Sequence, residues 1–444
     1  MQKELKERID RRDYNGVKNL LEQMNVVDIA QELEEVDEEL TVKVFRTMPK
    51  DTAAEVFAYL SADVQQSVIE AITDREIGGI IDELFVDDAV DFLEEMPANV
   101  VKRVLATVPE GKRDVINQLL QYPEDSAGSI MTIEYVDLKK NLTVRDAFNY
   151  IRNTGVDKET IYTCYVIDTD RKLLGTVSVR TLLLAREEEM IGDIMEKGTI
   201  SATTMMDKQS LANDFTRYGL LAMPIVDHEQ RLVGIVTVDD ALTVQEEEAT
   251  EDFELMAAMS PSDEPYLKTS VLTMTKNRVL WLMLLMLSAT VTGTIISGFE
   301  DAFAVLPALV AFIPMLMDTA GNSGSQSSTM VIRGMALEQI ASKDVLKVLW
   351  KEIRVAVLCG AALALVNFGR ILLTNDMDVA LALTVSITLY ITVVMAKSVG
   401  CLLPIGAKML KLDPAVMASP IITTVVDAVT LVIYFGLAKA IFGI

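Results

Sequence analysis

Residues 279–298 form an unbroken run without a charged side chain. A helix of about 20 apolar residues is long enough to cross the roughly 30 Å hydrocarbon core of a bilayer. We therefore predict a transmembrane helix in this run. The chain cannot be a wholly soluble globule if that prediction holds.

Four further apolar segments follow the first one and are also predicted to span the membrane. They cover residues 302–332, 355–374, 379–407 and 415–441. The short loops on one side contain Lys and Arg, for example Arg333, Lys347 and Lys408, and are therefore expected to be cytoplasmic. The opposite loops contain only acidic charges, at Glu300, Asp301, Asp376 and Asp378. Five spans place the amino terminus in the cytoplasm, in agreement with the absence of an apolar signal sequence, and the carboxyl terminus outside.

Charge is distributed very unevenly between the two parts of the chain. The whole sequence of 444 residues has a formal net charge of -25. Residues 269–444 contain ten acidic and twelve basic residues, whereas residues 1–268 contain 55 acidic and 28 basic ones, a net charge of -27. A surface this acidic repels nucleic acid and attracts cations. Cations are therefore the expected partners of the first part, and nucleic acid is not.

The residues available as metal ligands narrow the choice of cation. Cys164, Cys359 and Cys401 are far apart in the sequence, and His228 is the only histidine. Neither a disulfide framework nor a soft zinc, copper or iron site can be assembled from them. Any metal is expected to be bound by oxygen atoms.

One carboxylate, Asp427, lies within the last predicted span. Ser419, Thr423 and Asp427 recur at intervals of four residues, and Thr430 follows three later, so they form a polar stripe on one helix face. A charge at this depth costs about 2.5–3.5 kcal/mol on insertion scales and usually marks a functional site. The alternative is a structural ion pair of Asp427 with Lys397 or Arg370.

The second predicted span contains a dense polar run at residues 318–329, with the sequence DTAGNSGSQSST. Lipid cannot satisfy such a run, so it is expected to line a cavity or a close helix contact. Close packing through Gly321 and Gly324 is one interpretation. Asn322 and Gln326, four residues apart, favour a water-filled path, because neither suits a lipid-facing position.

The first 125 residues show an apolar period of twelve. One set comprises Met48, Leu60, Ile72, Leu84, Met96 and Val108, and a second comprises Phe45, Phe57, Ile69, Ile81, Leu93 and Leu105. Turn-forming residues such as Pro49 and Pro97 follow members of the first set. The pattern predicts an α-solenoid of short helices that share one core. Its acidic residues are expected to gather on one surface.

A second repeat, with a spacing of 59 residues, follows the solenoid. Residues 166–168 match residues 225–227, and residues 173–179 match residues 232–238. Each copy is expected to form two strands and a helix. The pair resembles tandem cystathionine-β-synthase (CBS) domains, which can hold an adenine nucleotide. By that resemblance Thr237 and Asp240 of the second copy are the candidate ribose contacts, and ATP is the candidate ligand.

Residues 243–266 connect this pair to the first span. Acidic residues alternate there with Leu255, Met256 and Met259, which predicts a helix with one acidic face. We expect this linker helix to join the cytoplasmic and membrane parts mechanically.

The order of these parts resembles the MgtE family of magnesium channels over essentially the whole chain. The most specific segments are residues 122–132 (YPEDSAGSIMT), the second-span run ending at Arg333 and Gly334, and Asp413 with Asp427. The chain departs from many members at Ala320, where they have glycine, and from some at Asp318. The expected fold is multidomain. It comprises an α-helical repeat domain (1–125), a tandem CBS pair with α/β fold (126–242), a linker helix (243–268) and an all-α membrane domain of five helices (269–444).

The resemblance implies a homodimer that admits Mg²⁺ and is not an enzyme. In it Asp427 binds hydrated Mg²⁺ in a pore formed by the second and fifth spans. The remaining candidate pore-lining residues are Gly321, Asn322, Gly324, Gln326, Ser419 and Thr423. The resemblance also implies closure by cytoplasmic Mg²⁺. The candidate ligands for that ion are Asp87, Asp91, Asp239, Asp240, Glu246, Glu247 and Glu251.

Two other functions remain open at this point. One is a membrane-anchored nucleotide sensor whose spans only dimerise, although an anchor has no use for Asp427. The other is a cation exchanger driven by sodium or protons, in which an intramembrane charge such as Lys397 would move. In either case the protein is expected in the plasma membrane as a multi-pass protein.

Overall fold

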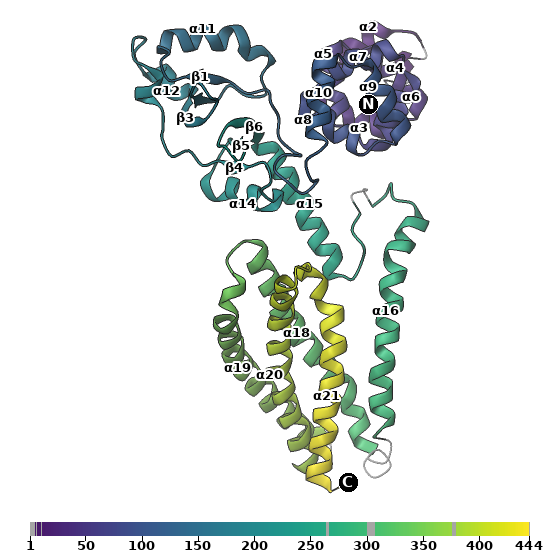
Figure 1. The fold of residues 1–444 in the computed structure, drawn as a ribbon. Helices are drawn as coiled ribbons and strands as arrows, with labels where there is room; N and C mark the ends of the chain where they lie inside the picture. The colour runs from purple at the N-terminus through teal and green to yellow at the C-terminus, as the bar shows by residue number, and fades with distance from the viewer. Residues whose placement is uncertain are drawn as a thin grey trace. The chain divides into compact units, whose positions relative to one another are not determined.

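The structure is a computed structural model that describes residues 5, 7–9, 11–262, 266–299, 307–374 and 379–443. The chain forms two compact units, Met1–Gln245 and Glu246–Ile444. Both are visible in Figure 1. The layout of a helical amino-terminal part, a CBS-like pair and a carboxyl-terminal helical region agrees with the predicted multidomain fold.

The first unit begins with a stack of short helices (Figure 1). Helices α2 to α10 span Tyr14–Leu21, Val26–Glu34, Glu38–Phe45, Lys50–Ala58, Ala62–Ala71, Asp74–Glu83, Val86–Glu94, Ala98–Thr107 and Glu110–Leu119. Several begin at a capping side chain: Asn25 accepts a hydrogen bond from a backbone N–H of α3, and Asp37 does so for α4. Such caps satisfy amide groups that a short helix would otherwise leave free.

The twelve-residue apolar period forms the core of this stack. Phe57, Ile69 and Ile81 are fully buried, and Leu60 and Ile72 are at most 5% exposed. Helices pack on their second neighbours, as α3 does on α5, α5 on α7 and α7 on α9. The predicted solenoid is therefore confirmed.

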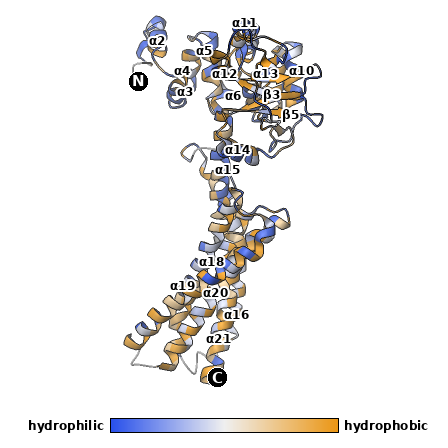
Figure 2. Cartoon of the chain, turned by 90° about the vertical axis from the view of Figure 1, so that its left-hand side faces the viewer, coloured by the Kyte–Doolittle hydropathy of each residue, from blue (hydrophilic) through white to orange (hydrophobic). Residues whose placement is uncertain are grey.

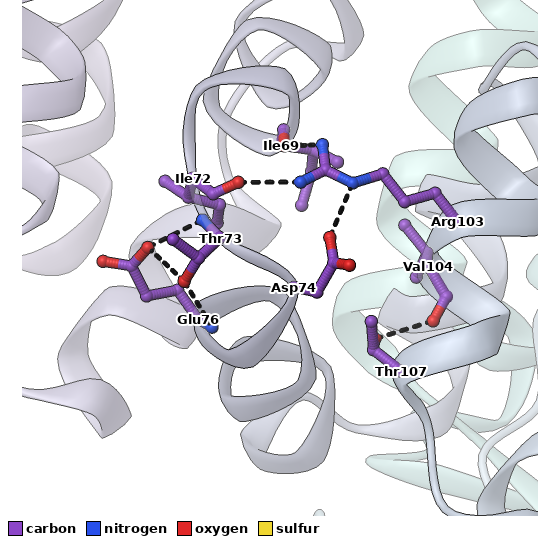
Figure 3. A network of polar contacts seen from close by, with 8 residues as sticks. All are labelled: Ile69, Ile72, Thr73, Asp74, Glu76, Arg103, Val104 and Thr107. Carbon is purple, nitrogen blue, oxygen red and sulfur yellow. Dashed lines mark hydrogen bonds and ion pairs between the residues drawn. The ribbon is translucent and has the colours of Figure 1, made fainter.

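Arg103 of α9 joins neighbouring helices through a polar network (Figure 3). Its guanidinium donates to the carbonyls of Ile69 and Ile72 over 2.9 and 2.8 Å, and Nε donates to Asp74 over 2.8 Å. These carbonyls belong to the end of α6, where the helix leaves backbone acceptors free. Arg103 therefore caps α6 and joins it to the start of α7.

The two CBS-like copies each form a three-stranded sheet. The first copy contains β1 (Asp137–Lys139), α11 (Val144–Thr154), β2 (Thr163–Ile167), β3 (Leu173–Ser178), α12 (Val179–Leu184) and α13 (Ile191–Ile194). The second contains β4 (Ala202–Thr203), α14 (Lys208–Tyr218), β5 (Ala222–Val226), β6 (Leu232–Thr237) and α15 (Val238–Met256). In both sheets the middle strand pairs parallel to the first and antiparallel to the last. The repeated strand, turn and strand are as predicted, and the short first strands β1 and β4 are additional.

Helix α15 begins directly after β6 and runs into the second unit. It ends at Met256, whereas the sequence favoured a helix up to residue 266. Two features stop it: Ala258 adopts a left-handed φ of 54°, and Pro261 disfavours helical backbone at the residue before it. The linker is thus a continuation of the second CBS helix.

The second unit is built from long helices that are mostly hydrophobic (Figure 2). They are α16 (Val271–Ser297), α18 (Ile313–Ala336), α19 (Val345–Thr374), α20 (Val379–Met409) and α21 (Ser419–Phe442). By length and hydropathy, four of the described helices can cross a membrane, namely α16, α19, α20 and α21. Helix α18 has 24 residues but is not one of these four, because its polar run lowers its hydropathy. Residues 302–306 of the predicted second span, and the acidic loop residues Glu300, Asp301, Asp376 and Asp378, lie outside the described residues.

Replacing Arg103 with methionine tests the capping network. The variant keeps the apolar stem but leaves two carbonyls at the end of α6, and Asp74, without their donor. We expect a loss of about 1–3 kcal/mol of unfolding free energy, measured by urea denaturation of a fragment covering residues 1–245. Arg75→Met, at an exposed position of α7, is the control and should change stability little. Equal effects of the two substitutions would contradict the assignment.

Candidate functional site

Asp427 lies in the middle of α21 and is half-buried within the second unit. The carboxylate of Asp318 on α18 lies close enough to Asp427 to repel it electrostatically. The structure therefore brings two acidic residues together inside the membrane part. Asp318 was not among the predicted site residues, although it begins the polar run of the second span.

An exposed polar stripe follows one face of α18. Asp318, Asn322 and Gln326, spaced by four residues, are all exposed, whereas Ala320 and Ser327 on the same helix are buried. A lipid-facing stripe of this kind would leave amide and carboxylate groups without hydrogen-bond partners. The stripe must therefore face water or another protein surface.

The glycines of α18 instead lie at helix contacts. A Cβ atom on Gly321 would approach Thr423 Cγ2 to 2.9 Å, and one on Gly324 would approach Ile422 Cγ2 to 2.7 Å. A Cβ atom on Gly400 of α20 would collide with the backbone of Gly324. Gly321 and Gly324 thus allow α18 to pack closely on α20 and α21, which is the packing interpretation of these residues.

The fifth-span stripe is only partly described. The Thr423 hydroxyl donates to the carbonyl of Pro420 over 2.9 Å, one turn earlier in the same helix. The side chain of Ser419 lies outside the described residues. The two cations considered as partners of Asp427 have other contacts: Arg370 donates to Asn367 over 2.9 Å, and Lys397 lies against α18.

A separate group of carboxylates gathers in the first unit, where α8 meets the CBS-like pair. It combines residues of α8, of the loops before β1 and β2, and of the start of α15, and we call it the carboxylate cluster. Its members are Asp87, Asp88, Asp91, Glu134, Glu159, Asp239 and Asp240. In the part of the chain that the structure describes, Asp87 Oδ1 and Glu159 Oε2 are buried without a hydrogen-bond partner. The cluster thus holds acceptors that no protein donor satisfies.

Burial and mutual repulsion change the acidity of this cluster. Burial, with Asp240 and Asp91 adding, raises the pKa of Asp88 to about 7. Burial, followed by the charges of Asp88 and Asp240, raises the pKa of Glu159 to about 8. Burial and Asp240 also raise the pKa of Asp87 well above its usual range. The packed arrangement therefore favours protons, or other cations, at this place.

Asp240 serves two predicted sites. Thr237 Oγ1 donates to Asp240 Oδ2 over 2.6 Å at the start of α15, and Thr237 also contacts Asp239. Burial raises the pKa of Asp240 to about 6. The proposed ribose contacts are thus joined to each other, and Asp240 also belongs to the carboxylate cluster.

Known proteins match nearly the whole chain. Family profiles match a divalent cation transporter, MgtE, at residues 313–437, the MgtE intracellular N domain at residues 24–125, and CBS domains at residues 127–188 and 191–247. The magnesium transporter MgtE of Thermus thermophilus is 33% identical over 439 residues, covering 98% of this chain and 97% of that protein. Its Bacillus subtilis counterpart is 32% identical over 429 residues, covering 97% and 94%.

The chain belongs to the MgtE family. MgtE proteins are ion transporters, so the protein is not an enzyme. Solved structures agree for the first unit. A crystal structure of the cytosolic domain of the Mg²⁺ channel MgtE in complex with ATP has a TM-score of 0.53 and 32% identity, covering 55% of this chain and all of that one. The soluble part of a magnesium transporter gives a TM-score of 0.53 at 28% identity, with 56% and 98% covered.

Another carboxylate of this MgtE protein, Asp252, lies near the end of α15 and close to Asp413. Burial, with Asp413 and Glu251 adding, raises the pKa of Asp252 to about 6. Asp413 begins the short helix before α21 and accepts the Ala415 amide over 2.6 Å. Leu255 and Met256 pack beside it on Ile332, Ala415 and Ala418. The linker helix therefore packs on the membrane helices through apolar side chains, and Asp252 lies near Asp413 beside this contact.

Sequence reasoning named some of these acidic residues and missed others. It named Asp87, Asp91, Asp239 and Asp240, and also Glu246, Glu247 and Glu251, which are exposed on α15. It missed Asp88, Glu134, Glu159, Asp252 and Asp318. Asp88 and Asp252 had a signal as neighbours of named carboxylates, and Asp318 had one as a carboxylate inside a predicted span. Among the described residues no three Asp, Glu, His or Cys groups converge closely enough to hold a metal ion.

The raised pKa values predict a pH-dependent stability of the first unit. Because Asp88 and Glu159 bind protons more tightly in the packed state than when unfolded, that state loses stability as pH rises through 6 to 8. A fragment covering residues 1–245 in a metal chelator should melt roughly 3 °C or more higher at pH 6 than at pH 8.5. Asp88→Asn with Glu159→Gln should flatten the difference. A melting temperature that does not change with pH in the wild type would refute this.

Proposed function

We propose that the protein carries Mg²⁺ into the cell through a pore that contains Asp427. Membership of the MgtE family supports this, because the chain matches two magnesium transporters at 32–33% identity over nearly their full length. Asp427, a carboxylate inside a transmembrane helix, is the observation in this chain that carries the proposal. Asp318, which acts on it, adds a second negative charge to the same place.

The pore forms between two copies of the chain in this proposal. A single copy leaves Asp318, Asn322 and Gln326 on an exposed face of α18, and lipid cannot satisfy them. A twofold partner facing α18 and α21 would enclose that stripe in a water-filled path. Helix α16 is compatible with such a dimer, because none of its described residues is buried within one chain.

The chemistry of Mg²⁺ fits a path of this kind. Mg²⁺ sheds its water reluctantly and usually keeps several waters when it binds. Paired copies of Asp427 can accept hydrogen bonds from the hydration shell, and the amide of Asn322 lies on the same exposed stripe as Asp318. Selection then depends on the width of the path and on acceptors that match a hydrated ion.

Asp427→Asn tests the pore assignment. The substitution preserves side-chain size but removes the negative charge that offsets the cost of bringing a divalent ion into the membrane. We expect Mg²⁺ uptake by a transport-deficient bacterium to fall to the level of cells without the protein. Glu338→Gln, an exposed carboxylate between α18 and α19, is the matched control and should support normal uptake. Undiminished uptake by the Asp427 variant, with equal amounts in the membrane, would overturn the assignment.

The carboxylate cluster is proposed to sense cytoplasmic Mg²⁺. Without divalent ions its charges repel, which favours separation of the repeat helices from the CBS pair. The described carboxylates do not converge on one point, but Mg²⁺ that keeps its water molecules can bridge Asp87, Asp88 and Asp240 through that water. Such an ion would stabilise the packed state, and that difference in affinity shifts the population toward closure. Asp91 and Asp239 are further candidate ligands. In this proposal the effect of Mg²⁺ binding reaches the pore along α15. Glu246, Glu247 and Glu251 are the candidate Mg²⁺ ligands on that helix, and Asp252 lies near Asp413 at its end.

Neutralising the cluster tests the sensing proposal. Asp88→Asn with Glu159→Gln reduces both the repulsion without Mg²⁺ and the gain in affinity on packing. The change in patch current between low and high cytoplasmic Mg²⁺ should therefore shrink. Asp170→Asn, an exposed carboxylate between β2 and β3, should leave that change as in the wild type. Full sensitivity to Mg²⁺ in the double variant would rule the cluster out as the sensor.

ATP is proposed as a second ligand of the CBS pair. A related cytosolic domain has been solved in complex with ATP, which supports this proposal. Thr237 and Asp240 are the residues of this chain assigned to the ribose. Because Asp240 also faces the carboxylate cluster, binding of nucleotide and of Mg²⁺ would draw on the same side chain.

The protein is a multi-pass membrane protein, and its place in the plasma membrane follows from its family. We propose that its amino terminus is cytoplasmic and its carboxyl terminus outside. An exchanger of related fold is the competing mechanism. Dependence of uptake on a sodium or proton gradient would favour that exchanger.

A further inference from the structure

Lys397 is a cation buried within the membrane helices. It lies on α20, and only 5% of its surface is exposed. Its Nζ atom lies 3.4 Å from Gln326 Oε1, 3.5 Å from Ser327 Oγ and 3.5 Å from the carbonyl oxygen of Ser323. All three acceptors belong to α18, so the ammonium group connects α20 to the polar part of α18.

The positive charge is balanced through a bridging hydroxyl. Ser327, itself 1% exposed, donates to Glu352 Oε2 on α19 over 2.6 Å. Its oxygen can accept from Lys397 at the same time, because a hydroxyl both donates and accepts. The chain Lys397, Ser327 and Glu352 therefore links three helices. Removing Glu352 or Ser327 would leave the buried charge of Lys397 without this compensation.

This contact also orients a pore-lining candidate. Gln326 lies on the exposed stripe of α18 with Asn322 one turn earlier, yet its carbonyl oxygen faces Lys397. A free amide can turn either its oxygen or its NH₂ group toward a passing ion or its water. With the oxygen engaged by Lys397, the NH₂ group is the part left for the path.

We propose that Lys397, braced by Glu352 through Ser327, is a positioning residue that fixes the orientation of Gln326 and the backbone of α18 beside the ion path. It does not move during transport, unlike the charge that an exchanger would require. This inference rests on the proposed pore, because it assigns the exposed face of α18 to that pore. Lys397 therefore affects the affinity for hydrated Mg²⁺ more than the rate at which a bound ion passes through the pore.

The test compares Mg²⁺ uptake by Lys397→Met and Lys397→Arg in purified, reconstituted protein. Methionine keeps the apolar stem and removes the charge, whereas arginine keeps the charge and the donors. Lys397→Met should raise the KM for Mg²⁺ about tenfold and change the maximal rate less than about threefold. Lys397→Arg should recover most of the affinity. Lys408→Met, an exposed lysine of the same helix, should behave as the wild type.

Coupling along the chain supplies the second measurement. Glu352→Gln should also raise the KM, and the double variant with Lys397→Met should be no worse than the more affected single variant, because either change already breaks the chain. A KM within twofold of the wild type for Lys397→Met, or independent, additive effects of the two changes, would overturn the proposal. If Lys397→Met fails to assemble, Ser327→Ala removes only the bridging hydroxyl, and a normal KM for it would be equally decisive. Asp427→Asn in the same assay separates the two proposals, because active transport by that variant would instead refute the pore itself.

Discussion

Polar groups inside a membrane must find partners other than lipid, and the second unit depends on that requirement. Buried groups meet it within the chain: Lys397, Ser327 and Glu352 satisfy one another across three helices. Asp318 and Asn322 do not, because they remain exposed on α18. In the proposed dimer, water and a second copy would cover the polar groups that the single chain leaves exposed. The proposed location of the pore rests on these exposed polar groups.

The first unit depends on the opposite arrangement, in which like charges are held together. Burial and repulsion raise the pKa values of Asp88, Glu159 and Asp240 into the range from about 6 to about 8. Near neutral pH part of this cluster is ionised, and packing its like charges together costs free energy unless a cation binds among them. A divalent ion neutralises two carboxylates at once and needs no change in pH. In the proposed sensor, the response to Mg²⁺ follows from the electrostatic cost of packing like charges together.

The sequence predicted the architecture well because periodic burial leaves a periodic signal. Phe57, Ile69 and Ile81 recur every twelve residues because each occupies the same position in successive helices. Strands β2, β3, β5 and β6 of the CBS pair were predicted because their sequence is repeated, whereas the short strands β1 and β4 were not predicted. The end of α15 at Met256 was missed. Pro261 indicates that the helix stops before it, but the left-handed backbone of Ala258, which ends the helix earlier, has no signal in its residue type. Local patterns reveal elements but give little information on where the chain turns.

The candidate site was less predictable, and the reason lies in long-range contacts. Asp427 could be found because a carboxylate in an apolar span is unusual by itself. Glu134 and Glu159 could not be found, because nothing in their own segments distinguishes them until folding brings them to α8. Lys397 was noticed as an intramembrane charge, but whether it pairs with Asp427, moves with an ion or braces α18 depends on which helix it meets. The contacts with Gln326 and Ser327 favour bracing, since a lysine held by three acceptors on one helix has a local structural task that a mobile carrier would lose at every cycle.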